Sequence, residues 1–223
     1  MKLFKFYSKN WYYIGGVLFV VLAFVVGFLG EGFNPLSKIL TLSFMALLVH
    51  QFEEYALPGG FPAIMNSVMM GEKEVPDRYL LNRKSCFFVN VVNGYPFYIL
   101  PIFFPNLIWL GLAQILFGMT QFFMHGIIAN VRMKSWYNPG LAAVVFLHLP
   151  IGSYYIWYVY ANGLIQPWHW IAGIGFLILA TVVIFLPLRL FKDKNSEYAF
   201  SAEEMKRFNM PEKLKRLSPS KPG

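Results

Sequence analysis

Charged residues and cysteines are both scarce in this chain. Only 13% of its 223 residues are charged and 57% are hydrophobic, whereas a soluble domain carries about 25% charged residues. This balance excludes an ordinary soluble domain and predicts an integral membrane protein. The single cysteine, Cys86, excludes an internal disulfide and any metal site built from several cysteines. We expect Cys86 to be a buried structural thiol.

Long apolar runs divide the chain into six candidate membrane-spanning helices. Each run is close to the length of about 20 mostly apolar residues that a helix needs to cross the hydrocarbon core. Turn-forming residues separate several of the runs, for example Pro105-Asn106 and Asn162-Gly163. The predicted fold is an all-α membrane helix bundle in residues 1–191, followed by a basic tail in residues 192–223. The six predicted spans are 11–29, 36–55, 85–104, 107–131, 140–160 and 168–191.

Basic residues lie almost entirely on one side of this predicted bundle. With six crossings, the amino-terminal segment, the loops 57–84 and 132–138 and the tail share one side, and Lys38 is the only basic residue on the other. The positive-inside rule assigns the basic side to the cytoplasm. We therefore predict a protein of the plasma (inner) membrane with both termini in the cytoplasm. Because this placement accounts for the net charge of +8, no nucleic-acid partner is predicted.

The tail is polar and mixed in charge. Ser201 and Glu204 have the spacing of a capping box for a short helix, which Pro211 is expected to interrupt. The basic residues of the tail either bind the anionic headgroups of membrane lipids or are simply solvated. These residues are Lys206, Arg207, Lys213, Lys215 and Arg216.

Histidines and carboxylates inside the predicted spans form the candidate site. His50, Glu53 and Glu54 end the second span, and their spacing of three and four residues places them on nearly one helix face. His125 in the fourth span and His148 in the fifth lie at a similar depth, about 8–12 Å inside the same boundary. Ionisable residues in a span are costly unless they are paired or solvated, so this shared depth indicates a functional site.

The residue types of this group suit several kinds of chemistry. Imidazole and carboxylate are the ligands expected for zinc or non-haem iron, so we predict a divalent metal, first zinc and alternatively iron or manganese. A metal-free acid/base or proton-relay site, or a set of hydrogen bonds that pins the bundle, remains open. The predicted metal ligands are His50, Glu53, Glu54, His125 and His148.

Polar residues near these ligands are candidates for supporting roles. One glutamate would be a ligand and the other a general base, so Glu53 and Glu54 are also predicted catalytic residues. Asn90, Asn93 and Asn130 either donate hydrogen bonds at the site or tie adjacent helices together. The apolar segment 62–70, which follows a turn at Pro58, forms either a lid over the site or a connection along the membrane surface.

The residues around the two glutamates resemble a known family motif. His50-Gln-Phe-Glu53-Glu54 followed by Pro58-Gly59-Gly60-Phe61 is similar to the motif of the HXXEE family of bacterial membrane proteins. The resemblance covers most of the membrane part, since asparagines and histidines recur in the later spans. It implies a membrane-embedded, metal-dependent enzyme but no particular reaction. The string is not the zincin motif H-E-x-x-H, so any metal requires ligands from several helices.

Our leading hypothesis from the sequence is a hydrolase-like enzyme that acts on a lipid or another amphiphile at the cytoplasmic leaflet. A bound metal would activate water for this reaction. The alternatives are a metal-free isomerase on a lipid-like substrate, a proton- or cation-coupled carrier, and a non-catalytic membrane protein with a structural polar cluster. The apolar outer halves of the spans argue against a carrier. The sequence specifies neither the substrate nor the oligomeric state.

Overall fold

Six helices of the protein are long and apolar enough to cross a membrane. The computed structural model describes residues 2–217, and this part of the chain contains helices and no β-strand. Each predicted span corresponds to one of the six helices, so the predicted all-α membrane bundle is confirmed. The spans occupy Lys2–Gly32, Pro35–Tyr55, Arg83–Phe103, Ile108–Met133, Leu141–Ala161 and Pro167–Leu190.

Three of the spans combine α-helical and π-helical segments. The first span begins at Lys2, nine residues before its predicted start, and ends in a short 3-10 turn. In order, the spans are α1 (Lys2–Leu29) with η1 (Gly30–Gly32); α2 (Pro35–Tyr55); α4 (Arg83–Phe87), η3 (Phe88–Gly94) and α5 (Tyr95–Phe103); α6 (Ile108–Phe122), η4 (Phe123–Ala129) and α7 (Asn130–Met133); α8 (Leu141–Ala143), η5 (Val144–His148) and α9 (Leu149–Ala161); and α10 (Pro167–Leu190).

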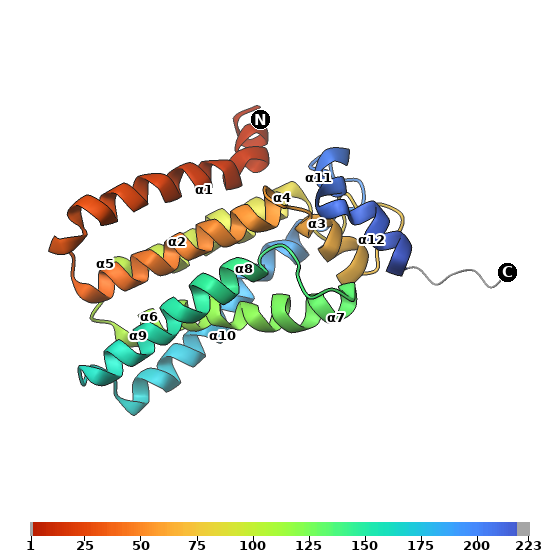
Figure 1. The fold of residues 1–223 in the computed structure, drawn as a ribbon. Helices are drawn as coiled ribbons and strands as arrows, with labels where there is room; N and C mark the ends of the chain where they lie inside the picture. The colour runs from red at the N-terminus through yellow and green to blue at the C-terminus, as the bar shows by residue number, and fades with distance from the viewer. Residues whose placement is uncertain (1, 218–223) are drawn as a thin grey trace.

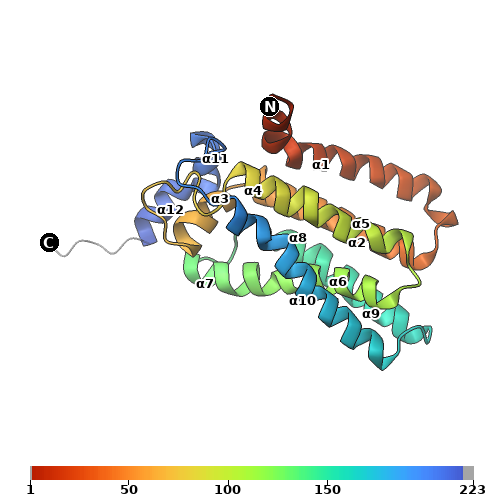
Figure 2. The ribbon, with the colours of Figure 1, turned by 180° about the vertical axis from the view of Figure 1, so that it is seen from behind.

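The second span, α2, is the central helix of the bundle. It packs against α1, α5, α6 and the fifth span, and 67% of the residues in its most apolar window are buried, compared with 11% for the first span. Figure 1 shows α1 lying along the outside of α2. Figure 2, the view from the other side, shows α10 crossing in front of α6. Side chains at the end of α2 therefore lie inside the protein.

Local signals in the sequence set both ends of α2. Asn34 caps its start, because Asn34 Oδ1 accepts a hydrogen bond from Leu36 N (2.9 Å) and Pro35 occupies the first turn. Beyond its end, Gly59 and Gly60 adopt φ values of +70° and +95°, which favour glycine. A β-carbon at Gly60 would lie 2.8 Å from Arg207 O, so this turn also lies close against the tail.

The tail folds back onto the bundle. It consists of α11 (Ala202–Lys206), η6 (Arg207–Asn209) and α12 (Met210–Leu217), and it covers the segment formed by α3 (Phe61–Ala63) and η2 (Ile64–Met69). The predicted capping box between Ser201 and Glu204 is confirmed. Pro211 does not interrupt the helix as predicted. The break comes earlier, at η6, and Pro211 lies in the first turn of α12, where proline is well tolerated.

Polar contacts join the tail to the rest of the chain. Arg83 forms an ion pair with Glu204, and Lys5 Nζ lies 2.7 Å from Glu197 Oε2. Burial alone would raise the pKa of Glu204, but hydrogen bonds from Arg83 and Ser201 lower it below its usual value. Both termini of the described chain therefore lie at one end of the bundle, which we call the tail end (Figure 1).

Candidate metal centre

The three π-helical segments within the spans all lie near the tail end, and each carries predicted site residues. Asn90 and Asn93 are in η3, His125 is in η4, and His148 is the last residue of η5. A π-helical turn contains more residues than an α-helical one, and such segments are frequent at functional sites. They alter the direction of these side chains relative to a continuous α-helix.

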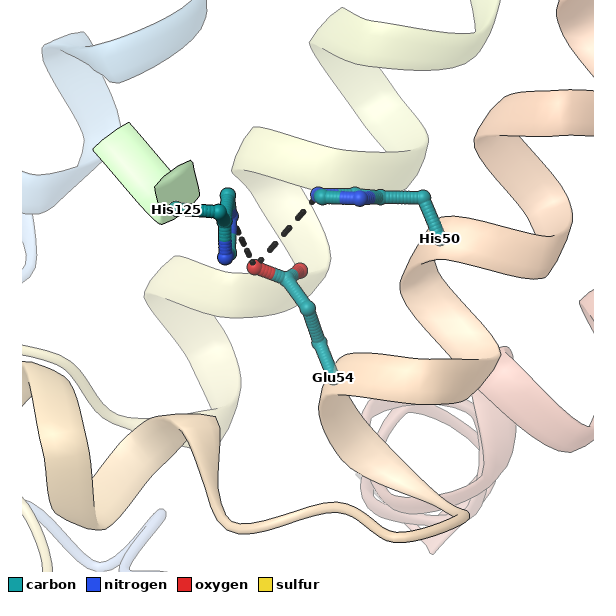
Figure 3. Close-up of side chains that lie close together, drawn as sticks. All are labelled: His50, Glu54 and His125. Carbon is teal, nitrogen blue, oxygen red and sulfur yellow. Dashed lines mark ion pairs between the residues drawn. The ribbon is translucent and has the colours of Figure 1, made fainter. Parts of the chain in front are cut away.

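His50, Glu54 and His125 form a buried group that we call the His/Glu cluster. His50 and Glu54 lie about one turn apart on α2, and His125 approaches them from η4 (Figure 3). Glu54 Oε1 lies 3.5 Å from His50 Nε2 and 3.3 Å from His125 Nε2. No more than 5% of the surface of any of the three residues is exposed.

Hydrogen bonds on the opposite side of each ring fix the tautomer that each histidine has when it is neutral. His50 Nδ1 lies 3.0 Å from Gly140 O, and a carbonyl can only accept, so His50 Nδ1 carries a hydrogen. His125 Nδ1 lies 2.8 Å from Asn138 Oδ1. Asn138 Nδ2 donates to His125 O and to Asn130 Oδ1, each at 2.7 Å, so the oxygen of the Asn138 amide faces His125 and accepts. In both neutral rings the lone pair is therefore on Nε2, facing Glu54.

A positive charge, either a bound cation or a proton on one of the rings, stabilises this arrangement. Two nitrogen lone pairs and a carboxylate oxygen that face one another repel, and buried charges in proteins are paired or bound to metals. Charge-assisted hydrogen bonds between nitrogen and oxygen are about 2.7–2.9 Å long, and both Glu54 separations exceed that. Ligands about 2.0–2.1 Å from a tetrahedral zinc ion lie roughly 3.3 Å apart. The donor atoms and their spacing therefore fit a divalent metal, with ligand atoms all within 4.8 Å of one another.

Gly140 lies against both imidazole rings. A β-carbon there would be 2.6 Å from His125 Cε1 and 2.9 Å from His50 Cε1. Its φ of +103° is also unfavourable for residues other than glycine. Glycine therefore lets the backbone approach the rings and present its carbonyl to His50.

Glu53 lies outside the cluster. Its carboxylate accepts hydrogen bonds from Tyr137 OH (2.7 Å), Ala142 N (3.1 Å) and Ala143 N (2.8 Å). The two backbone groups belong to the first turn of the fifth span, where N–H groups have no partner within the helix. Burial, together with the hydrogen bond to Glu53, raises the pKa of Tyr137, which therefore stays protonated and donates. Glu53 is thus satisfied without a metal.

His148 is a neighbour of the cluster. Its ring centre lies 5.7 Å from that of His50, and the residue is 3% exposed. His148 Nε2 has no hydrogen-bond partner among the described residues. The ligand atoms that lie within 4.8 Å of one another belong to His50, Glu54 and His125, and His148 is not in this group.

The three predicted asparagines have different surroundings. Asn130 Oδ1 accepts from Asn138, so Asn130 supports the residue that orients His125. Asn90 lies beside the site and accepts from Gln51 Nε2 (3.2 Å). Asn93 donates to Val183 O (2.9 Å) on the other side of η3 and ties the third span to the sixth.

A cavity of about 110 Å³ adjoins the cluster. Its wall is mainly apolar. Phe61 and Met65, from the segment 61–69 that the tail covers, contribute to this wall. Segment 62–70 is therefore partly buried beneath the tail, with Ile64 and Asn66 fully buried, and its start contributes to the wall of the site. The polar residues on the cavity wall are His50, Gln51, Glu54, Tyr55, Asn90, Tyr98, Gln121 and His125.

Asn138, Gly140 and Tyr137 are site residues that the sequence analysis missed. Asn138 is fully buried, although asparagine is normally an exposed residue. The string Asn138-Pro139-Gly140 is a strong turn signal immediately before the fifth span. This turn lies at the same membrane boundary as the helix ends that carry His50 and His125, and that shared boundary was the available indication.

A family comparison covers the part of the chain that contains this site. The family described as "Protein of unknown function with HXXEE motif" matches residues 41–155, which is more than half of the 223-residue chain. The matched segment includes the whole His/Glu cluster as well as Asn138 and Gly140. No curated protein and no solved structure matches the chain. The chain belongs to the HXXEE family.

Proposed function

We propose that the protein is a membrane-embedded, metal-dependent hydrolase that acts on an amphiphile. The observation that carries the proposal is the orientation of His50 and His125. Both rings have their Nδ1 hydrogen committed to another acceptor, and both Nε2 atoms lie 3.3–3.5 Å from one oxygen of Glu54. Two imidazoles and one carboxylate are a ligand set of catalytic zinc sites.

The residues of the cluster suit a hydrolytic reaction. Glu54, His50 and His125 would hold the metal, and a divalent metal with open positions polarises a carbonyl and makes water more acidic. In hydrolysis the water oxygen bonds to the acyl carbon, the bond to the leaving group breaks, and the leaving group takes up the proton. Glu54 is the carboxylate on the described cavity wall; Oε1 would bind the metal, and its second oxygen would accept a proton from water.

The surroundings of the cluster favour a substrate from the bilayer. The adjoining cavity has a mainly apolar wall, and Phe185 on that wall is 40% exposed at the surface of the bundle. Beside the cavity, the carboxyl-terminal tail packs over this end of the bundle. We place this end in the cytoplasm of a bacterial cell, because almost all basic residues lie there. The substrate would then be an amphiphile of the cytoplasmic leaflet.

A second candidate function is metal-free acid/base catalysis, for example isomerisation of a lipid-like substrate. One observation favours it: a proton on His50 Nε2 or His125 Nε2 would also relieve the repulsion with Glu54. Histidine and glutamate serve as acid and base in many enzymes. The metal content of the purified protein separates the two proposals.

The test measures metal and activity on the same preparations. Protein purified in detergent without chelators is analysed by plasma mass spectrometry, as wild type and as His125→Ala. Hydrolysis of fluorogenic acyl amphiphiles is then followed in nanodiscs before and after chelation. We expect one zinc, iron or manganese ion per wild-type chain, and activity that is lost on chelation and restored by the metal.

His169→Ala is the matched control for His125→Ala. His169 is also a buried histidine, but it caps α10 at the opposite end of the bundle, where its Nδ1 accepts from Gln166 N (2.9 Å). The control should retain metal and activity. Metal-free wild type with activity that chelators leave unchanged would favour the acid/base proposal. Equal metal in wild type and His125→Ala would exclude the proposed centre.

A further inference from the structure

Two buried polar atoms on the cavity wall have no hydrogen-bond partner within the described residues: Gln51 Oε1 and Tyr98 OH. Both residues are 1% exposed. A buried polar atom without a partner costs about 1–3 kcal/mol, so such atoms are uncommon in native proteins. Both side chains line the same cavity of about 110 Å³, so a group bound there lies near both of them.

The orientation of the Gln51 amide follows from its neighbours. Asn90 Nδ2 donates to Cys86 O (3.0 Å), and this bond leaves Asn90 Oδ1 to accept from Gln51 Nε2 (3.2 Å). The amide nitrogen of Gln51 is therefore engaged, and its oxygen remains as a free acceptor. A ligand that satisfies this oxygen must donate an N–H or an O–H.

Tyr98 adds a second requirement. Its hydroxyl can donate to a ligand oxygen as well as accept. An amide with an N–H and a hydroxyl are groups that can both donate to Gln51 and accept from Tyr98. An ester can accept from Tyr98, but it has no hydrogen for Gln51. Binding an ester would leave Gln51 Oε1 unsatisfied.

The size of the cavity limits how much of the ligand it encloses. Its volume is about 110 Å³, smaller than the roughly 150 Å³ cavity that holds a benzene molecule. It therefore has room for a polar group and a few carbon atoms. The rest of a longer chain must lie outside, and the partly exposed Phe185 marks where the wall reaches the surface of the bundle. The apolar part of the wall includes Leu47, Val89, Phe117, Ile184 and Leu188.

From these contacts we infer that the cavity recognises an amide or hydroxyl group on an apolar chain, and that the substrate is an acyl amide in preference to the matching ester. The substrate assignment rests on the proposed hydrolase function. Hydrolysis of an amide joins a water oxygen to the acyl carbon and breaks the C–N bond, and the nitrogen takes up a proton. The products are a carboxylic acid and an amine.

The inference is tested by binding, which requires no catalysis. Hexanamide, hexan-1-ol and methyl hexanoate are compared by the rise that each causes in the unfolding temperature of the purified protein. In wild type, the amide is expected to bind about 10- to 100-fold more tightly than the ester, because the ester leaves Gln51 unpaired. Equal binding of amide and ester in wild type would overturn the inference. Preference for the alcohol alone would confirm recognition of a donor and overturn the amide assignment.

Variants identify the residue that discriminates. Gln51→Met should reduce the ratio of amide to ester affinity to near one, and Tyr98→Phe should weaken both probes. Gln114→Met is the matched control. Gln114 Oε1 is also buried with no partner in the described part of the chain, but Gln114 lies outside the cavity wall and donates to Leu40 O. It should keep the wild-type ratio. A ratio that persists in Gln51→Met would overturn the assignment to Gln51.

One further variant separates this inference from the proposed metal centre. The probes are also tested on His125→Ala, which lacks one predicted ligand. A preference that remains there shows that Gln51, and not a metal, selects the donor, even if the hydrolase proposal fails. A preference that disappears there would assign it to the cluster and overturn the inference.

Discussion

The last turn of α2 gives its two adjacent glutamates different surroundings. Glu53 and Glu54 are both buried, 7% and 5% exposed. Glu53 faces the start of the fifth span, where two backbone N–H groups and the Tyr137 hydroxyl donate to it. Glu54 faces two imidazole nitrogens that carry lone pairs when the rings are neutral. The first carboxylate is satisfied by fixed donors, whereas the second needs a positive charge beside it, from a metal ion or from a proton on one of the rings.

The difference teaches that residue type and burial alone do not identify a ligand. A carboxylate at the first turn of a helix is stabilised by the unpaired N–H groups and by the helix dipole. Glu53 therefore has a structural role, which holds the fifth span against α2. That role positions Gly140 and so indirectly orients His50. Substitutions of Glu53 and of Glu54 should therefore have distinguishable effects.

The largest effect is expected for Glu54→Gln. The substitution removes a ligand charge, so metal content should fall below about a tenth of the wild-type value, since the loss of an orienting partner alone costs 10- to 100-fold in affinity. Plasma mass spectrometry after purification measures this. Glu53→Gln is the matched control and should keep its metal. Similar losses in both variants would mean that the two glutamates share the ligand role.

Gly140→Ala should affect both the stability of the protein and its metal content. The added β-carbon would meet His125 and His50, and the positive φ adds strain of about 1–3 kcal/mol. We expect a lower unfolding temperature and loss of metal. Gly163→Ala serves as the control, because Gly163 also has a positive φ of +64° but no heavy atom within 4 Å of an added β-carbon. If both variants keep their metal, the contact of Gly140 with the rings is not needed for metal binding.

Glu53→Gln should reduce stability and spare the metal. The amide nitrogen cannot accept from one of the three donors, so we expect the free energy of unfolding to fall by about 1–3 kcal/mol. Denaturation in a series of detergent mixtures measures the change. Unchanged stability would contradict the capping role of Glu53.

Tyr137→Phe should have the smallest effect, about 0.5–1.5 kcal/mol of unfolding free energy, because it removes one of three donors to Glu53. Burial and Glu53 raise the pKa of Tyr137 in the folded state. The contribution of the hydroxyl is therefore fully present below its unfolded pKa of about 10 and is lost as the pH rises through the higher folded value. The difference between wild type and variant should stay constant from about pH 7 to 9. A difference that shrinks over this range would contradict the assignment.

The sequence predicted the spans and the depth of the polar residues well. Hydrophobic length and turn residues are local properties, and they located all six helices. The common depth of His50, His125 and His148 followed from a rise of about 1.5 Å per residue. The structure places the His50 ring centre 4.8 Å from that of His125 and 5.7 Å from that of His148.

The partner of each polar residue was beyond sequence reasoning, because it depends on rotation about the helix axes. The π-helical segments change that rotation, and no residue pattern in η3, η4 or η5 predicted them. The assignment of Glu53 to a helix start depended on where the fifth span packs. The tail is a further example: its capping box was predictable, but its packing on Ile64 depends on long-range contacts.

The π-helical segments have a consequence for comparing this chain with other members of its family. Such a segment accommodates one extra residue locally, so deleting one residue from it can restore a regular α-helix while the turns on either side keep their orientation. A one-residue deletion at 123–129, for example, would change the direction of side chains within that segment, His125 among them, relative to their present neighbours. In an alignment of spanning helices, a gap of that size would mark divergence of the site and not harmless variation in length.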